Sequence, residues 1–169
     1  MQGTAPRIIG PEDGKQVDLG SVGARFMIYG EESGGGFSVV EHPMPPRALA
    51  APVHRHSRED EYTYVLEGRM GALLGDDVVY AEPGDFVWKP RDQWHTFWNA
   101  GDEPARILEI ISPGGFERYF EELSELLAGG PPEPEVIGPL AARYGIEFQP
   151  ERTPEIVERF GVSFGPPDA

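Results

Sequence analysis

The segment HRHSREDEY, residues 54–62, places two histidines one residue apart and follows them with three acids in a row. Successive side chains of a β-strand point to opposite faces, so His54 and His56 would project from one face of an extended segment. Imidazole nitrogens and carboxylate oxygens are ligands that divalent transition metals accept. The segment therefore predicts part of a metal-binding site and leaves open which acid belongs to it.

Strand register decides between two of the acids, Asp60 and Glu61. Turning Asp60 inward would bury two tyrosines and a leucine at alternate positions, whereas turning Glu61 inward would bury Thr63 and Val65. The apolar pattern taken alone therefore favours Asp60.

The composition limits the chemistry of such a site. The chain of 169 residues has no cysteine, which excludes a disulfide framework, a thiolate metal site and a cysteine nucleophile. Any metal would sit on His, Asp and Glu side chains. The formal net charge of −15, from 14 basic and 29 acidic residues, disfavours nucleic acid and anionic membranes as partners.

The chain has no apolar stretch long enough to cross a membrane, and its first residues lack the apolar run of a signal peptide. Its length is that of about one domain. We therefore expect a cytoplasmic protein whose partner is a small molecule.

Short apolar or alternating runs recur between Val22 and Ile111, and each is bounded by Gly, Pro, Asp or Asn. The turn Gly75-Asp76-Asp77, between ALL and VVY, is typical of these boundaries. Many short strands without helices between them are typical of an antiparallel sandwich or barrel. The sequence therefore predicts an all-β fold.

After Ser112 the apolar residues recur at the spacing of a helix rather than in short strand-like runs. The segment FERYFEELSELL predicts an amphipathic helix, and Pro139 and Thr153-Pro154 are placed to open two shorter ones. We expect one domain overall, with strands and barrel over residues 1–112 and helices and tail over 113–169, packed on the barrel or on a partner subunit.

Two stretches resemble the motifs of the cupin superfamily, of the small single-domain (monocupin) type. The first, over residues 54–68, has two histidines, a glutamate and a glycine at the family's spacing: His54, His56, Glu61 and Gly68. The second, over residues 84–99, has Gly84, Pro90, His95 and Asn99. Two positions depart from the pattern: Ala48 and Asp92 stand where the family usually has glycine, and Asp tolerates positive φ better than most residues.

The resemblance implies a cupin double-stranded β-helix, a jelly-roll barrel, with a short C-terminal helical extension. It also implies one divalent transition metal ion, Fe, Mn, Ni, Co, Cu or Zn, held by His54, His56, Glu61 and His95. The family spacing thus selects Glu61 over Asp60 and leaves Asp60 and Glu59 as solvent-facing turn residues. The alternative is a satisfied polar cluster without metal, although buried imidazoles and a carboxylate without a cation would be costly.

Several neighbours of the motifs are candidates for supporting roles. Hydrogen bonds to the ligands could come from Thr63, Gln93 or Asn99. Three further residues could reach the rim of the barrel, as solvated groups or substrate contacts: Glu41, His42 and Arg106.

Strand parity separates the aromatic side chains into two faces. If His95 points inward, Trp94 and Trp98 point outward and need a cover, either a C-terminal helix or a second subunit of a homodimer. Phe86 and Trp88 alternate in the same manner, and we interpret them as core residues.

The intact ligand set and the helical tail are similar to small bacterial cupins related to quercetin dioxygenase. The resemblance implies a metal-dependent dioxygenase acting on a small enolic, phenolic, aromatic or polyketide-like compound, with Glu61 as ligand and catalytic proton acceptor. Two alternatives stay open: a metal-dependent isomerase or epimerase of a carbonyl or sugar compound, and a non-catalytic metal-dependent small-molecule binding protein. The first would need several Lys or Arg side chains at the barrel mouth for an anionic substrate; the chain has two lysines, Lys15 and Lys89, which disfavours a phosphorylated sugar, although it also has 12 arginines.

Overall fold

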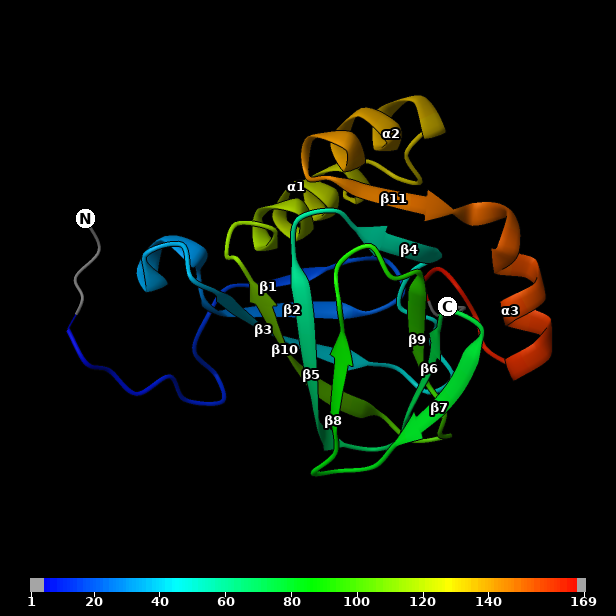
Figure 1. Cartoon of the computed structure of the whole chain (residues 1–169), viewed down its shortest axis with the longest axis horizontal. Coiled ribbons are helices and arrows are strands. Elements are labelled where there is room, and N and C mark those ends of the chain that lie inside the picture. The colour runs from blue at the N-terminus through cyan, green and yellow to red at the C-terminus, as the bar shows by residue number, and fades with distance from the viewer. Residues whose placement is uncertain (1–4, 167–169) are drawn as a thin grey trace.

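The computed structural model describes residues 5–166, and these form two antiparallel sheets that face each other (Figure 1). The six-stranded sheet has, in spatial order, β1 (Gln16–Asp18), β2 (Gly23–Ile28), β3 (Ser38–Met44), β10 (Ala105–Ser112), β5 (Asp60–Glu67) and β8 (Phe86–Lys89). The five-stranded sheet has β11 (Ile146–Gln149), β4 (Val53–His56), β9 (His95–Asn99), β6 (Met70–Leu74) and β7 (Asp77–Ala81). The predicted all-β jelly roll is confirmed. Residues 1–4 and 167–169 of the expected barrel and tail stretches lie outside the described residues.

The interior between the sheets changes from apolar to polar along the strands. In β5 and β10, Val65 lies opposite Ile107, whereas two residues further along Thr63 lies opposite Glu109. Met70 and Phe97 join the apolar end, and all these side chains are buried. The apolar end forms the hydrophobic core of the barrel, and the polar end holds the side chains that could do chemistry.

Two tight turns fix the lengths of the strands. Gly68, after β5, has φ +78°, and a Cβ built there would lie 2.6 Å from the Cβ of Ala105. Asp92, in the turn before β9, has φ +64°. Asp92 therefore adopts the left-handed conformation expected of it, and its departure from glycine leaves the turn intact.

The C-terminal extension begins with α1 (Glu117–Leu127), as the periodicity predicts. The next helix, α2 (Pro134–Arg143), starts earlier than expected, because Pro134 takes the first-turn position and Pro139 lies inside the helix. Strand β11 follows and adds to β4, with Phe148 opposite His54. The last helix is α3 (Thr153–Phe160), and two 3-10 turns, η1 (Gly30–Ser33) and η2 (Pro150–Arg152), complete the elements.

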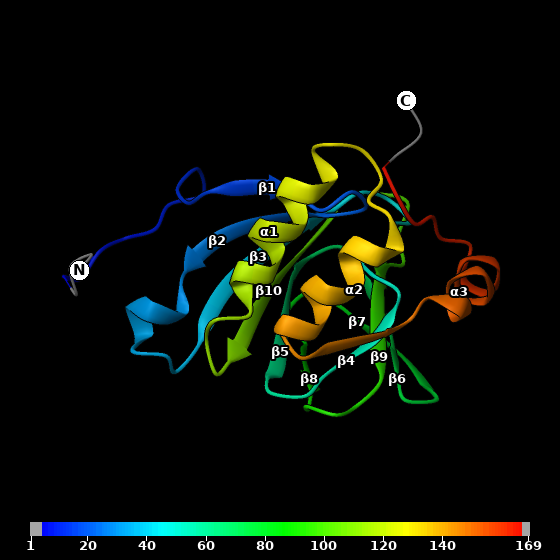
Figure 2. The same ribbon diagram turned by 90° about the horizontal axis from the view of Figure 1, so that it is seen from above.

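The extension covers the five-stranded sheet and the open end of the barrel. Seen from above, α1 and α2 lie in front of the strands (Figure 2). Helix α3 lies beside the five-stranded sheet (Figure 1), where the Phe160 ring stacks on Trp98 with centroids 4.2 Å apart. Trp98 is 1% exposed, so the last helix of the same chain covers it. Trp94 is partly covered by the Arg55 guanidinium, 4.7 Å above its ring.

The interpretation of Phe86 and Trp88 as core residues is wrong. They are 56% and 60% exposed, whereas Lys89 on the same strand is 1% exposed. Register explains the difference: Lys89 pairs with Glu61 across β5 and β8 and shares its inward face. Side chains alternate along a strand, so an inward Lys89 places Trp88 and Phe86 on the outward face.

Candidate metal centre

Four side chains meet at the polar end of the barrel: those of His54, His56, Glu61 and His95. One potential ligand atom from each lies within 4.8 Å of every other, and all four residues are buried. The two histidines of β4 share a face, β4 pairs with β9 so that His54 lies opposite His95, and Glu61 reaches in from the other sheet. The structure thus brings together all four residues that the cupin motifs indicate.

Backbone carbonyls fix the tautomers of two histidines. His54 Nδ1 lies 2.8 Å from the carbonyl oxygen of Pro52, and His95 Nδ1 lies 2.9 Å from that of Gln93. A carbonyl oxygen only accepts, so each Nδ1 carries the proton and each neutral ring presents an Nε2 lone pair.

The side chains of Thr63 and Asn99, which were expected to hydrogen-bond to the metal ligands, have other partners. The Asn99 amide donates to backbone carbonyls, including that of Glu103 at 2.8 Å, and the Thr63 hydroxyl donates to Glu109. Gln93 does support His95, but through its backbone.

The contacts inside the cluster suit a bound cation. His95 Nε2 lies 3.0 Å from Glu61 Oε2, although the neutral ring has no proton at Nε2 to donate. Both ring nitrogens of His56 are buried and, among the described residues, have no hydrogen-bond partner. Ligand atoms bound about 2.1 Å from one ion lie roughly 3 Å apart when adjacent. The donor set and its spacing therefore fit a divalent transition metal.

The protonation states also suit metal binding. Burial lowers the pKa of His54 well below its usual 6.5, and the neighbouring imidazoles of His95 and His56 lower it further, because a proton on His54 would be repelled by a proton on either of them. Burial alone would raise the pKa of Glu61, but the Lys89 ammonium and His56 hold it well below 4.5. Neutral imidazole and ionised carboxylate are the forms that bind metal.

A second buried charge network adjoins the cluster, and sequence reasoning missed it. Lys89 Nζ lies 2.7 Å from Glu109 Oε1 and 3.1 Å from Glu61 Oε2. The ammonium also lies 4.6 Å from the centroid of the Phe97 ring, and the Thr63 hydroxyl is 3.0 Å from Glu109 Oε1. Burial opposes the charge on Lys89, but the two carboxylates raise its pKa above 10.5. The sequence shows that Lys89 shares a strand face with Val87, but that this face points inward follows only from the pairing of β8 with β5, where Val87 lies opposite Thr63.

Glu59, expected to face solvent, is only 7% exposed. Its Oε2 lies 3.7 Å from His56 Nδ1, so the turn folds this acid back toward the cluster. Asp60 behaves as expected and binds the Arg91 guanidinium at the surface, at 2.9 Å.

The three rim candidates occupy two different places. His42 is buried inside the barrel, where its Nδ1 donates to the Gly23 carbonyl at 2.9 Å and its ring packs edge-on against Phe120. Glu41 and Arg106 lie together on the opposite face of the six-stranded sheet, 3.3 Å apart. The expectation that Glu41 and Arg106 reach the barrel mouth is therefore wrong.

Aromatic rings from the C-terminal extension cover the cluster. The Phe116 ring meets the His56 ring edge-on, with centroids 4.4 Å apart, and the Phe148 ring lies 5.8 Å from that of His54. The candidate metal centre is thus lined by apolar rings on the side of the extension.

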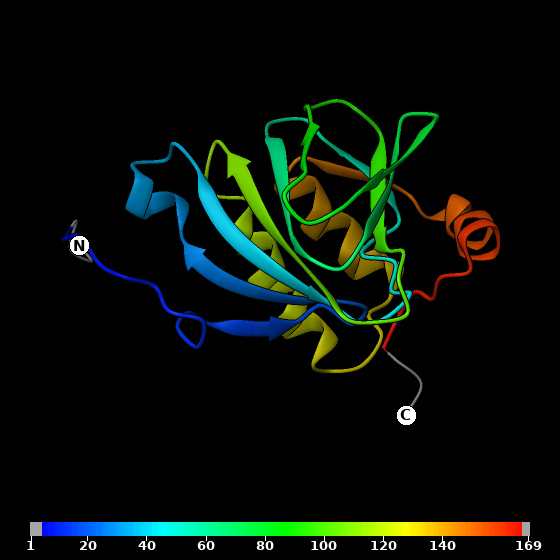
Figure 3. The same cartoon turned by 90° about the horizontal axis from the view of Figure 1, so that it is seen from below.

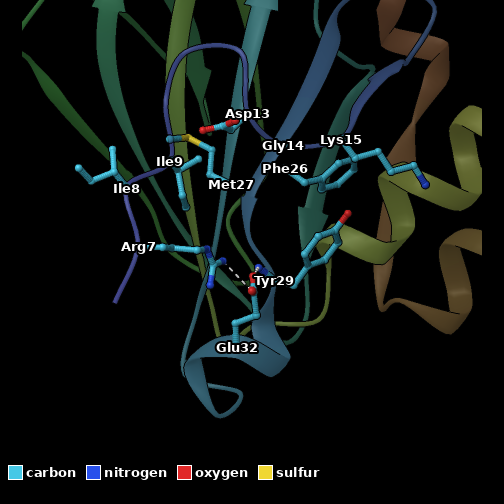
Figure 4. A pocket seen from close by; sticks show the side chains of 10 residues that line it. All are labelled: Arg7, Ile8, Ile9, Asp13, Gly14, Lys15, Phe26, Met27, Tyr29 and Glu32. Atoms are coloured by element: carbon cyan, nitrogen blue, oxygen red, sulfur yellow. Dashed lines mark hydrogen bonds and ion pairs between the residues drawn. The ribbon is translucent and has the colours of Figure 1, made fainter. Parts of the chain in front are cut away.

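A hollow of about 450 Å³ lies elsewhere, between the N-terminal segment and β2 (Figure 4). Its wall includes the ion pair between Arg7 and Glu32, 2.6 Å apart, and Tyr29 at the end of β2. None of the four clustered residues lines it. This hollow is not the opening of the candidate metal centre.

Comparison with known proteins places the fold and the site in one family. The cupin domain family matches residues 40–111. Quercetin 2,3-dioxygenase of Bacillus subtilis (strain 168) is 26% identical over 139 residues, 80% of this chain and 40% of the relative. Polyketide synthase CurC of Streptomyces cyaneus is 35% identical over 60 residues, 36% of this chain and 39% of the relative. The chain thus spans less than half the length of these relatives.

Among solved structures, the polyketide cyclase RemF from Streptomyces resistomycificus has a similar fold, with a TM-score of 0.55. The two are 24% identical, and the match covers 64% of this chain and 80% of that one. With the barrel, the motifs and the clustered side chains, these matches define a cupin. Residues 40–111 of the chain are a cupin domain, which lies within the single barrel of the described residues. Within that range, every helix is too short or too polar to span a lipid bilayer.

Proposed function

We propose that this cupin is a metal-dependent dioxygenase that acts on a small enolic, phenolic or polyketide-like compound. The observation that carries the proposal is the buried set of three histidines and one glutamate. Four protein ligands would leave an ion that prefers six free to bind substrate and dioxygen as well. The similarity to a quercetin 2,3-dioxygenase over 80% of this chain supports the choice of reaction. Similarity to a polyketide synthase protein supports an aromatic or polyketide-like substrate.

The side chains of His54, His56, Glu61 and His95 would hold the ion. When bound, the ion supplies a Lewis-acidic and redox-active position for an enolate and dioxygen. Glu61 accepts the proton of the substrate hydroxyl, since the Lys89 ammonium 3.1 Å away keeps its carboxylate ionised. The rings of Phe116 and Phe148 exclude water and suit an aromatic substrate.

An isomerase acting on an anionic sugar finds less support. Such a substrate needs a cation beside the centre that is free to bind it, but Lys89, the cation that contacts the cluster, is already held by two carboxylates. A binding protein without turnover has the same ligand set, so only an activity measurement separates it from a dioxygenase.

Oxygen uptake tests the proposal. The protein is stripped of metal, reloaded with each of the candidate ions in turn and mixed with a panel of flavonols and diketones. We expect uptake with at least one ion, abolished in Glu61→Gln and retained in Asp60→Asn, since Asp60 faces the surface and binds Arg91. Absence of uptake with every ion would contradict the proposal, and a substrate-induced change in the metal spectrum without uptake would indicate a binding protein.

A further inference from the structure

Glu59, the first of the three consecutive acids, is buried beside the candidate metal centre without being one of the four clustered residues. Its Oε2 is buried and has no hydrogen-bond partner among the described residues. Burying a carboxyl oxygen without a partner costs free energy, and such atoms are rare in folded proteins. The position of Glu59 therefore calls for a reason other than the stability of the fold.

The turn that carries Glu59 is held in place by its other residues. Ser57 donates to the carbonyl oxygen of Gly145 twice, from its backbone N–H and from its hydroxyl, at 2.9 Å each. The Arg58 guanidinium donates to the carbonyl oxygen of Arg143 at 3.0 Å. These bonds tie the turn to the junction of α2 and β11, beside which it lies in the views from above (Figure 2) and from below (Figure 3). The turn thus has anchors that do not involve the Glu59 side chain.

His56 presents its two ring nitrogens to two different acids. Its Nε2 lies 3.4 Å from Glu61 Oε1, on the side of the cluster, whereas its Nδ1 lies 3.7 Å from Glu59 Oε2. Both nitrogens are buried without a hydrogen-bond partner among the described residues, and the Phe116 ring packs edge-on against the imidazole. Glu59 Oε2 and His56 Nδ1 are therefore two buried polar atoms that face each other and that nothing else satisfies.

The other two histidines of the cluster show what this nitrogen needs. His54 Nδ1 donates to the carbonyl oxygen of Pro52 at 2.8 Å, and His95 Nδ1 donates to that of Gln93 at 2.9 Å. His56 has no carbonyl at the same nitrogen. A neutral histidine that binds a metal through Nε2 carries its proton on Nδ1, and that proton is almost always donated to a carboxylate, a carbonyl or water. His56 thus requires an acceptor that is not a backbone carbonyl.

We propose that Glu59 is the positioning residue of His56: its Oε2 accepts the Nδ1 proton and holds the ring with Nε2 toward the metal. At 3.7 Å the two atoms are about half an ångström beyond the range of an N–H···O hydrogen bond, a gap that a small rotation of the carboxyl group closes. A carboxylate is a stronger acceptor than a carbonyl, so His56 becomes the most basic of the three imidazole ligands. The inference rests on the metal centre of the proposed function and not on the reaction proposed for it.

Zinc binding to the full chain tests this inference with two measurements. Zinc affinity is measured by competition with a chromophoric chelator, and proton–nitrogen NMR spectra of the zinc-loaded protein detect histidine Nδ1 protons that exchange slowly with water. In the wild type we expect a protected Nδ1 proton on His56. In Glu59→Ala this signal should be lost while those of His54 and His95 remain, and zinc should bind roughly 10–100-fold more weakly.

The matched control is Asp60→Ala, which removes one negative charge from the next residue. Asp60 binds the Arg91 guanidinium at the surface, so this variant should keep the His56 signal and the zinc affinity of the wild type. Glu59→Gln keeps an acceptor oxygen without the charge, so it should keep the signal and bind zinc with an affinity between those of the wild type and Glu59→Ala. Circular dichroism verifies that each variant is folded, and Glu59→Leu replaces Glu59→Ala if that variant does not fold.

A folded Glu59→Ala protein that keeps the protected His56 proton or the zinc affinity of the wild type would overturn the inference. So would an equal loss of affinity in Asp60→Ala, because the effect would then be one of net charge. A wild type that binds no zinc would contradict the metal centre itself. Oxygen uptake enters neither measurement, so failure of the proposed reaction and failure of this inference are separate results.

Discussion

Lys89 Nζ lies 3.1 Å from Oε2 of Glu61, so a buried ammonium contacts the single carboxylate of the candidate metal centre. The same nitrogen lies 2.7 Å from Glu109 Oε1. The ammonium neutralises one of two buried negative charges and holds Glu61 in its ionised form, which is the form a metal requires.

Replacing Lys89 with Met tests the strength of this network. The change leaves two buried carboxylates without a counter-ion, and breaking a buried ion pair costs about 3–5 kcal/mol. We expect the free energy of unfolding, measured by urea denaturation of metal-free protein at pH 7, to fall by about this amount. The double variant Lys89→Met/Glu109→Gln should recover part of the loss, because it removes one of the two charges. A Lys89→Met protein as stable as the wild type would contradict the prediction.

Strand alternation and motif spacing, which are local properties, predicted the barrel and the four clustered residues. The register of Glu61 is the clearest case: the apolar pattern favoured Asp60, the family spacing favoured Glu61, and the structure buries Glu61 at 4% exposure. Thr63 and Val65 turn inward with it, as that register requires.

Features that depend on which strands become neighbours were not predictable in the same way. Interpreting Phe86 and Trp88 as core residues places Lys89 on the solvent side of the strand. The pairing of β5 with β8 and β10 instead places Lys89 between Glu61 and Glu109. Strand β11 has four residues, too few for a periodicity, and exists because it pairs with β4. In both cases tertiary contacts outweigh local pattern.

The stability of the metal-free protein should fall as the pH is lowered below about 6.5. Burial lowers the pKa of both His54 and His42 below 6.5, whereas the unfolded chain has histidines near that value. The unfolded state therefore binds more protons in this range, and each such histidine removes up to about 1.4 kcal/mol per pH unit. Glu61 adds to the loss only below about pH 4.5, because its pKa is lowered from that value.

Urea denaturation of metal-free protein at pH 7.5, 6.5 and 5.5 measures this dependence. We expect His42→Gln to lose less stability than the wild type between pH 6.5 and 5.5, because it lacks one of the two titrating groups. Equal slopes for the two proteins would show that His42 is not held neutral by burial.

Phe116→Ala should destabilise the protein and open the metal centre. Phe116 is 2% exposed and its ring lies 4.4 Å from that of His56, so truncation leaves a cavity beside a ligand. Comparable substitutions cost about 3–5 kcal/mol in unfolding free energy. We also expect a chelator to remove the metal faster than from the wild type, as followed by absorbance of the cobalt-loaded protein. Phe164→Ala, at a residue 47% exposed, serves as the control and should change neither quantity.

Metal content tests the central claim most directly. The amount of transition metal per chain is measured by inductively coupled plasma mass spectrometry on protein purified without added metal. The proteins compared are the wild type, His54→Ala, Glu61→Ala and His42→Gln. His42 is the matched control, a buried histidine of the same barrel that stands outside the cluster of four. We predict bound transition metal in the wild type and in His42→Gln, and its loss from His54→Ala and Glu61→Ala. Full metal content in both His54→Ala and Glu61→Ala would contradict the assignment of the site.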